Sequence, residues 1–179
     1  MSHVASIERI NRLIRNIPDF PKPGIQFKDI TPLLGSPGGF SDAVDAMLDL
    51  APRKIDMVAA VESRGFLFGA PMAMALHAGF VPIRKPGKLP GTTFEQYFDL
   101  EYGSSTLAMH QDALQPGQRV LLVDDLLASG GTLIAAAKLI QQAGGVVAFT
   151  SVLIELAELD GRAMLAEAGL TAFASVIQC

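Results

Sequence analysis

The chain has 179 residues, half of them hydrophobic, and a formal net charge of −4 at pH 7. This length suits one domain with a small appendage. The acidic balance argues against a protein whose main role is to bind nucleic acid, because phosphate contacts need a basic face. No apolar run approaches the roughly 18 residues that cross a membrane. The lone cysteine, Cys179, excludes an internal disulfide framework and indicates a reducing, cytoplasmic setting. We therefore expect neither nucleic acid nor a membrane as a partner.

The N-terminal part of the chain reads as a flap joined to the main body. Residues 6–17 place apolar side chains at helical spacing and predict a helix. Residues 18–24 hold three prolines and a glycine, which predicts an irregular segment. A second helix is predicted over residues 40–50. We interpret residues 1–34 as a small hood and residues 35–179 as the core.

From residue 57 onward, short apolar strands alternate with helical segments. Strands are predicted over residues 57–61, 79–83, 106–110, 119–123, 146–154 and 172–177. Helices are predicted over 65–77 with an interruption near Pro71, over 133–142 and over 160–168. This alternation indicates an α/β fold with a mostly parallel central sheet of about five strands flanked by helices. Ligands in such folds bind beyond the carboxyl ends of the strands.

The segment from Lys85 to Ser105 does not fit the alternation. It carries prolines and glycines first and then four aromatic residues among acidic ones. Structureless segments of this length in a compact domain are uncommon and are usually functional lids. The alternatives are a solvated excursion or a hairpin. We favour a mobile lid at about residues 86–105 because of the aromatic residues.

A buried strand that ends in two acids and a glycine loop is the most informative stretch. The sequence from Val120 to Thr132 reads VLLVDDLLASGGT. Carboxylates at the end of an apolar strand are costly unless cations or hydroxyl groups meet them. The small residues that follow offer backbone N–H groups and a helix N-terminus, which together form a phosphate cradle. A nucleotide-binding Walker loop is excluded because Gly131, not lysine, precedes Thr132. The remaining alternative is a capped helix beside solvated acids.

Two basic clusters follow two of the predicted strands. Glu-Ser-Arg-Gly at residues 62–65 comes after strand 57–61, and Arg-Lys-Pro-Gly-Lys at residues 84–88 comes after strand 79–83. Arginine can grip a diphosphate with two hydrogen bonds, and lysine acts as a point charge. Each cluster alone could be ordinary surface charge. Their corresponding positions at strand ends favour an anion site.

The run from Val120 to Thr132 resembles the PRPP-binding motif of the type I phosphoribosyltransferases, where PRPP is 5-phosphoribosyl 1-diphosphate. The resemblance narrows to the adenine phosphoribosyltransferase family through residues 18–32, 62–69, 83–91 and 100–103, and it covers nearly the whole chain in order. It implies the type I phosphoribosyltransferase fold with a hood. It also implies a purine-salvage reaction in which PRPP and adenine give AMP and pyrophosphate.

The resemblance also assigns roles to individual residues. Asp124 and Asp125 correspond to the acids that contact the ribose hydroxyls. The residues corresponding to the 5-phosphate loop are Ala128, Ser129, Gly130, Gly131 and Thr132. Arg64, Lys85 and Lys88 correspond to diphosphate positions, and Ser63 and Arg84 are also expected to bind PRPP. The expected catalytic set is Glu101, Asp124, Asp125 and Arg64.

The base site and the lid are assigned in the same way. Phe27 matches the aromatic residue that packs on adenine, main-chain groups around Ile25 read its edge, and Lys28 stands where the family has an arginine. Ile154 and Leu156 are expected to form an apolar wall. Glu101 and Tyr102 match the acid–aromatic pair of the lid, and Glu101 is a candidate to exchange a proton with the purine.

The resemblance further implies Mg²⁺ as cofactor, bound mainly through PRPP with no ligand directly from the protein, and a homodimer. Three other readings are weighed against it. A different purine could be the acceptor, the chain could be a regulatory PRPP sensor, or it could be a PRPP-making kinase. The absence of an added nucleic-acid-binding segment disfavours the sensor, and the short chain disfavours the kinase.

Overall fold

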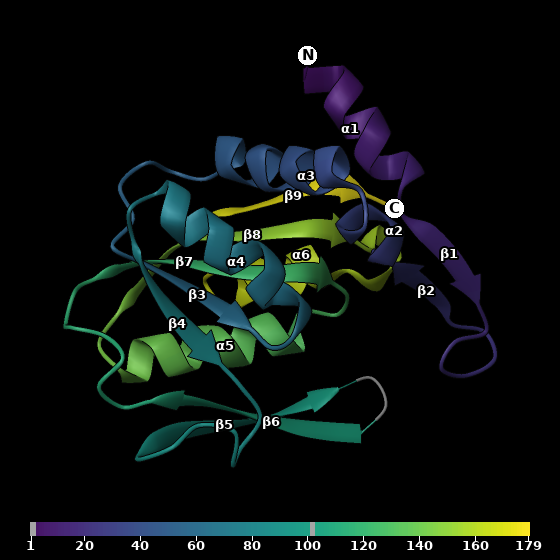
Figure 1. Ribbon diagram of the computed structural model, residues 1–179. Coiled ribbons are helices and arrows are strands. Elements are labelled where there is room, and N and C mark those ends of the chain that lie inside the picture. Colours follow the sequence, from purple (N-terminus) through teal and green to yellow (C-terminus); the bar gives the residue numbers. More distant parts are fainter. Residues whose placement is uncertain (1–2, 101–102) are drawn as a thin grey trace. The chain divides into compact units, whose positions relative to one another are not determined.

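The computed structural model describes residues 3–100 and 103–179 (Figure 1). The contacts divide the chain into two compact units, the first ending at Asp49 and the second spanning Leu50–Cys179. The first unit extends beyond the predicted boundary at residue 34 because it includes most of the helix α3, Pro37–Leu50. The assignment of a hood and a core by function remains a prediction.

The first unit begins with a helix and a short hairpin. The helix α1 covers His3–Arg12, and the strand β1, Arg15–Pro18, pairs antiparallel with β2, Gln26–Asp29. The short helix α2, Thr31–Leu34, leads into α3. The predicted helix over residues 6–17 is therefore wrong beyond Arg12. Pro18 pushes the residue before it toward extended backbone, and β2 offers that backbone a partner strand.

The turn between β1 and β2 confirms the predicted irregular segment, apart from Pro18, which lies in β1. Asp19 and Gly24 both have positive φ angles, 55° and 86°. The Asp19 carboxylate accepts a hydrogen bond of 2.7 Å from the Gly24 amide. The Phe20 amide also donates to the Ile25 carbonyl at 3.3 Å, so the turn is closed by its own hydrogen bonds.

The second unit is built on a five-stranded parallel sheet of order β4-β3-β7-β8-β9. The strands are β3, Met57–Val61; β4, Gly79–Ile83; β7, Arg119–Leu127; β8, Val146–Glu155; and β9, Phe173–Gln178. The predicted α/β fold class is confirmed. Strands buried on both faces explain why their sequences are nearly continuous apolar runs.

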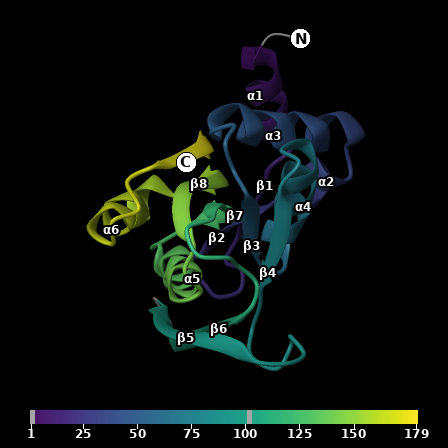
Figure 2. The same cartoon turned by 90° about the vertical axis from the view of Figure 1, so that its left-hand side faces the viewer.

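Helices cover both faces of this sheet, as Figure 2 shows for α4 and α5. The helix α4, Arg64–Ala75, packs on β3, β4 and β7, and α5, Gly131–Gln142, packs on β7 and β8. The 3-10 helix η1, Ala157–Leu159, and the helix α6, Gly161–Glu167, connect β8 to β9. The predicted interruption near Pro71 is wrong, because α4 is continuous. Its packing along three strands compensates for the hydrogen bond that proline removes.

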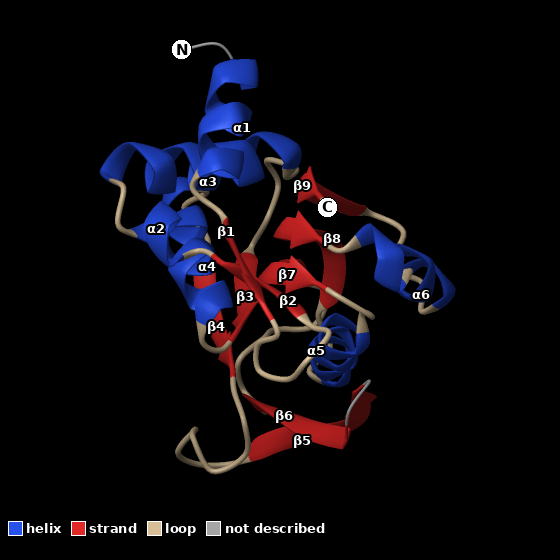
Figure 3. Cartoon of the chain, turned by 90° about the vertical axis from the view of Figure 1, so that its right-hand side faces the viewer, coloured by secondary structure: helices blue, strands red, loops and turns tan. Residues whose placement is uncertain are grey.

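A two-stranded hairpin occupies most of the segment predicted to be a lid. The strand β5, Thr93–Leu100, pairs antiparallel with β6, Gly103–His110, and this separate two-stranded sheet packs on α5 (Figure 3). An antiparallel bridge between Ala108 of β6 and Arg84, the residue after β4, joins it to the end of the main sheet. Of the alternatives considered for this segment, the hairpin is the correct one, and the predicted strand 106–110 lies within β6. Phe94 and Phe98 pack against the core of the second unit. Whether the hairpin moves as a lid remains a prediction.

The strand β7 continues four residues past its predicted end at Val123. Its pairing with β8 is maintained through Asp124↔Val152 and Leu127↔Glu155, which keeps both acids within the strand. The helix α5 begins at Gly131, two residues before its predicted start. The link between strand and helix is therefore only three residues long, Ala128–Gly130, and it holds the acids close to the N-terminus of α5.

Candidate active site

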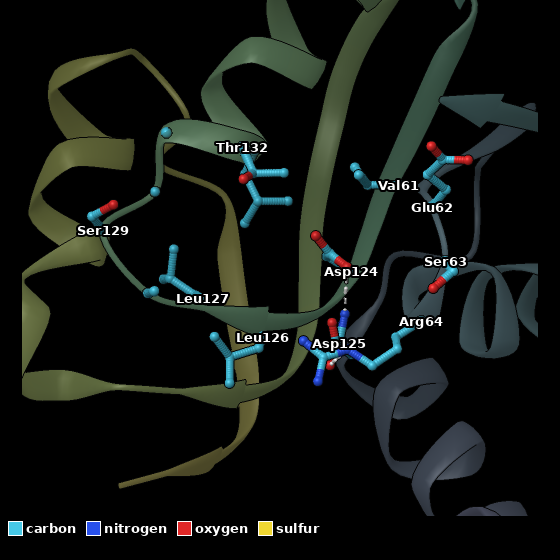
Figure 4. A pocket seen from close by; sticks show the side chains of 14 residues that line it. Val61, Glu62, Ser63, Arg64, Asp124, Asp125, Leu126, Leu127, Ser129 and Thr132 are labelled. Carbon is cyan, nitrogen blue, oxygen red and sulfur yellow. Dashed lines mark hydrogen bonds and ion pairs between the residues drawn. The ribbon is translucent and has the colours of Figure 1, made fainter. Parts of the chain in front are cut away.

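A cleft of about 330 Å³ lies at the carboxyl ends of β3 and β7 (Figure 4). It is lined by residues 61–64 from the end of β3 and the start of α4, and by residues 124–133 from the end of β7 through the start of α5. The N-termini of two twelve-residue helices therefore face the same space. Both N-termini carry unsatisfied N–H groups and the positive end of the helix dipole, which favours an anionic ligand.

Two buried carboxylates form the floor of the cleft. Asp124 is 8% exposed and Asp125 is 4% exposed. Burial raises the pKa of Asp124 well above its ordinary value, and the neighbouring charge of Asp125 raises it further. Burial also raises the pKa of Asp125, although the Arg64 charge opposes this shift. Carboxylates in such a place need hydrogen-bond donors, which a sugar bearing hydroxyl groups supplies.

Arg64 is the cation that meets this acidic pair. Its Nε lies 2.9 Å from Oδ2 of Asp125 (Figure 4). A Cβ atom on Gly65 would lie 3.0 Å from Oδ1 of Asp124 and 3.1 Å from the Val123 carbonyl oxygen, so a side chain would be crowded where α4 approaches β7. Ser63 precedes the helix, and its side chain makes no capping hydrogen bond. The predicted Ser63, Arg64, Asp124 and Asp125 are thus brought together in one cleft.

The predicted phosphate loop wraps the other side of the cleft, with Asp124 and Thr132 facing the same hollow (Figure 4). Gly130, the residue before α5, has a φ angle of +93°, which favours glycine, and no side chain caps the helix. The first amides of α5 therefore remain available to a ligand. The structure places all five predicted loop residues, Ala128 to Thr132, along this cleft.

The second basic cluster lies beside the cleft and does not line it. Glu62, which does line it, accepts hydrogen bonds from Arg84 Nε at 2.6 Å and from the Lys85 amide at 2.8 Å. Partial burial disfavours the charge of Glu62, but these hydrogen bonds and the Arg84 charge lower its pKa. Arg84 Nη1 also donates to the Lys88 carbonyl at 3.0 Å. Arg84 therefore ties the turn that carries both lysines to Glu62, while the lysine side chains are exposed.

The residues predicted for adenine belong to separate units. Phe27 lies in β2, half-buried, with its ring centroid 5.0 Å from that of Phe20 in an edge-to-face arrangement. Ile25 and Lys28 lie in the turn before β2 and within β2. In the second unit, Ile154 lies in β8 and is fully buried. Leu156, the first residue after β8, is half-buried. The predicted lid residues Glu101 and Tyr102 lie outside the described residues.

Sequence reasoning missed two groups at this site. Glu62 joins the two basic clusters, and its signal was an acid directly after an apolar strand. Gly161, at the start of α6, contacts the back of the phosphate loop. This contact joins residues about thirty positions apart in the chain, so no local motif indicates it. The only sequence signal was the short link between β8 and α6.

Comparisons with known proteins agree with this geometry. Residues 43–162 match the family described as phosphoribosyl transferase domain. Adenine phosphoribosyltransferase from Cutibacterium acnes is 55% identical over 161 residues, covering 90% of this chain and 91% of that protein. The one from Thermobifida fusca is 55% identical over 168 residues, covering 93% and 96%. The chain belongs to the adenine phosphoribosyltransferase family.

Solved structures of this family share the fold. The crystal structure of the enzyme from Thermoanaerobacter pseudethanolicus has a TM-score of 0.92 and 50% identity, covering 97% of this chain and 99% of that one. The enzyme from Saccharomyces cerevisiae has a TM-score of 0.89 and 35% identity, covering 97% and 99%. The predicted family, fold class and enzyme class are confirmed.

Proposed function

We propose that the cleft between β3, β7, α4 and α5 binds PRPP, and that the chain transfers its phosphoribosyl group to adenine, giving AMP and pyrophosphate in purine salvage. One observation carries the proposal. Two buried carboxylates, an arginine and the N-termini of two helices face one space of about 330 Å³. A ligand with hydroxyl groups between two phosphate-bearing ends matches this arrangement of charges.

Family relatives support this choice of ligands. The Saccharomyces cerevisiae enzyme, 35% identical, was solved with an imino-altritol bisphosphate and adenine. The Giardia lamblia enzyme, 38% identical, was solved with 9-deazaadenine. The first relative was therefore solved with a sugar analogue that carries two phosphates together with adenine, a combination that supports the ligands proposed here.

We assign the 5-phosphate of PRPP to the loop from Ala128 to Thr132. Its amides lie at the N-terminus of α5, and Ser129 and Thr132 add hydroxyl donors. The ribose hydroxyls would donate to Asp124 and Asp125. The diphosphate would then face Ser63 and Arg64, with Arg84, Lys85 and Lys88 as the neighbouring positive charges. This order follows the cleft from the start of α5 to the start of α4.

The reaction replaces the diphosphate at C1 of ribose by a purine nitrogen. Negative charge grows on the leaving diphosphate, where Arg64 and the α4 N-terminus stabilise it. Positive charge grows on the ribose, where Asp124 and Asp125 favour it. Holding the reactants in line can supply about 7–11 kcal/mol in favourable cases, so no covalent intermediate with a side chain is needed. By family resemblance, Glu101 would exchange a proton with the purine. A lid closing over Glu101 and Tyr102 would exclude water.

The residues of the cleft fit a magnesium ion that arrives on PRPP. Within residues 3–100 and 103–179, no group of three or more His, Cys, Asp or Glu side chains could hold a metal by itself. Magnesium keeps several of its waters and binds substrate phosphates, so PRPP would carry the ion, while Asp124 and Asp125 would bind the ribose hydroxyls. Bound to PRPP, the ion would neutralise charge on the leaving diphosphate.

We assign adenine selection to the predicted base residues. The Phe27 ring offers an aromatic face, the main chain around Ile25 offers hydrogen bonds, and Lys28 offers a cation. Ile154 and Leu156 would supply the apolar wall. Leu156 has the more accessible side chain of the two, so it should make the direct contact.

We also propose that the chain acts as a homodimer in the cytoplasm. Three large apolar side chains of α4 and the edge strand β4 are exposed: Leu67 at 40%, Met74 at 79% and Phe80 at 36%. Such a face on a helix and a sheet edge is suited to contact with a second copy. None of the helices in the described part of the chain is long and apolar enough to span a membrane.

The first test of the PRPP site is Asp125→Asn. This change removes the charge that pairs with Arg64. We expect the Kd for PRPP, measured by calorimetry with Mg²⁺ present, to rise about tenfold or more, since a hydrogen bond to a charged group contributes about 1.5–3 kcal/mol. Asp56→Asn is the matched control, because Asp56 accepts a hydrogen bond from the Arg119 amide at the opposite edge of the sheet. Wild-type PRPP binding and turnover in a folded Asp125→Asn protein would contradict the proposal.

A further inference from the structure

The phosphate loop rests on a second segment of the chain that takes no part in the cleft. This backing segment runs from Glu155, the last residue of β8, through η1 to Arg162 in the first turn of α6. Its Leu156 amide donates to the Leu127 carbonyl at 2.9 Å, directly before the phosphate loop. The backing segment therefore follows the loop along its outer side.

Gly161 is the point of closest approach between the two. A Cβ atom at this position would overlap the Ala128 carbonyl oxygen and would lie 2.8 Å from Cδ1 of Leu127. In return, a Cβ atom on Gly130 would lie 3.2 Å from the Gly161 carbonyl oxygen. Two glycines thus let the backbones touch at the residues that shape the phosphate loop. A shift of α6 would be transmitted directly to Ala128 and Gly130.

An ion pair fixes the two ends of the backing segment. Arg162 donates to Glu155 through Nε at 2.9 Å and Nη2 at 2.5 Å, a two-pronged contact that sets orientation as well as distance. Glu155 is 3% exposed and also accepts a hydrogen bond of 2.6 Å from the Ser175 hydroxyl of β9. The Arg162 guanidinium lies 4.6 Å from the centre of the Phe173 ring. The hydrogen bond from Arg162 is the main cause that lowers the pKa of Glu155, and it raises the pKa of Arg162.

We propose that the Glu155–Arg162 pair is a positioning device for PRPP: it holds the first turn of α6 so that Gly161 supports the phosphate loop from behind. Neither residue lines the cleft, so both act through the loop. The inference rests on the proposed role of residues 128–132 in binding the 5-phosphate. It predicts that breaking the pair loosens the loop and weakens PRPP binding, with a smaller effect on adenine, because the proposed wall residue Leu156 keeps its own hydrogen bond to Leu127.

The test uses Arg162→Met, which keeps the apolar stem, and Arg162→Lys, which keeps the charge without the two-pronged geometry. We expect the Kd for Mg²⁺-PRPP, measured by calorimetry, to rise about tenfold in Arg162→Met, because a loop that must be ordered on binding costs affinity. The KM for adenine and the kcat at saturating PRPP should stay within about twofold. Arg162→Lys should restore little of the loss. Ser175→Ala, which leaves the ion pair in place, should raise the Kd less than Arg162→Met does.

Arg119→Met is the matched control. Arg119 also holds a neighbouring segment, with its Nε donating to the Lys54 carbonyl at 3.0 Å, but it starts β7 at the far end of the sheet from the cleft. The Kd of the Arg119→Met protein for PRPP should not change, even if this variant unfolds at a lower temperature. Equal changes in PRPP binding for Arg162→Met and Arg119→Met would show a general loss of stability and overturn the positioning role.

Thr132→Val separates the inference from the proposed function beneath it. If Thr132→Val leaves PRPP binding unchanged, the assignment of the phosphate loop fails, and the positioning role fails with it. If Thr132→Val weakens binding but folded Arg162→Met and Ser175→Ala do not, the loop assignment stands and only the positioning role is wrong. Should Arg162→Met not fold, Arg162→Lys, which lacks the two-pronged contact, decides between the same two outcomes.

Discussion

Asp124 and Asp125 lie in the last part of β7, where burial works against their ionised forms. Natural proteins accept such a cost at functional sites, where groups are selected for the ligand and not for stability. Arg64 offsets part of it through the contact with Asp125. The acidic pair should therefore destabilise the folded protein when no ligand is bound.

This view predicts that Asp124→Asn is more stable than the wild type at neutral pH while being impaired in PRPP use. The folded-state pKa of Asp124 is raised, so its protonated form fits the folded state, and stability is lost as pH rises through that pKa. The variant should gain about 1 kcal/mol in unfolding free energy near pH 8. The gain should shrink as pH falls toward 4. Thermal unfolding from pH 4 to 8 measures it, and a pH-independent difference would contradict the burial argument.

Glu62 and Arg84 form a second charged pair, at the edge of the cleft. Arg84 donates to Glu62 and to the Lys88 carbonyl, so its role in PRPP binding is at least partly to hold the turn with Lys85 and Lys88. We predict that Glu62→Gln weakens pyrophosphate binding about threefold to tenfold, because a charge-assisted hydrogen bond is exchanged for a weaker one. Calorimetry with Mg²⁺-pyrophosphate measures the effect. If Arg84 acted by direct contact alone, freeing it from Glu62 would leave binding unchanged or make it tighter.

The residues of the cleft could be predicted because their chemistry is local in sequence. The two acids, the glycines and Thr132 follow one another within nine positions, and the structure places them together. The support of that loop could not be predicted. Arg162, Glu155 and Ser175 come from three elements, and nothing in their separate neighbourhoods indicates that α6 returns to Ala128.

Among the secondary-structure elements, the distribution of apolar residues along the chain predicted β3 and β4 with their correct bounds. The same signal misplaced the end of the first helix, because Ile17 fits a helical stripe and an inward-facing strand position equally well. It also did not favour the hairpin, which was only one of the alternatives to a lid. Phe94 and Phe98 alternate with exposed residues such as Tyr97, which is 60% exposed, and this period of two was outweighed by the number of aromatic residues.

The hairpin β5–β6 touches the N-terminus of α5 as well as its side. A Cβ atom on Gly131 would lie 3.0 Å from the Asp99 carbonyl oxygen and 3.4 Å from Cδ2 of Phe98. The hairpin thus constrains the residue at which the phosphate loop becomes a helix. Movement of the hairpin and the shape of the loop should be coupled through this contact.

We therefore predict that Gly131→Ala both destabilises the fold and weakens PRPP binding. Its backbone does not need glycine for its φ angle, so the cost comes from overpacking against the hairpin, about 1–3 kcal/mol. Gly35→Ala is the control, since its added Cβ would meet only an ordinary contact of 3.4 Å with the Thr31 carbonyl. Denaturant unfolding and PRPP calorimetry measure both effects. Unchanged PRPP binding in a destabilised Gly131→Ala would show that hairpin and loop are not coupled.

For the molecule as a whole, the charge distribution matters more than the net charge. The chain carries −4 overall, yet its proposed substrate is strongly anionic. Arg64, the N-termini of α4 and α5, and the turn with Lys85 and Lys88 gather positive potential at the carboxyl edge of the sheet. The fold class followed from the alternation of apolar strands and helices, because that pattern is a property of the whole sequence. The base specificity is set by a few side chains, so its prediction rests on family resemblance.

The measurement that tests the central claim most directly is a panel of purine bases. The purified protein would be supplied with PRPP, Mg²⁺ and, in separate reactions, adenine, hypoxanthine, guanine or xanthine, and nucleotide formation would be followed. The account predicts AMP and pyrophosphate from adenine, with kcat/KM for each other base lower by roughly a hundredfold or more, as expected of a site that reads hydrogen bonds on the base. Product from a 6-oxopurine in preference to adenine, or no product from any base while PRPP still binds, would contradict it.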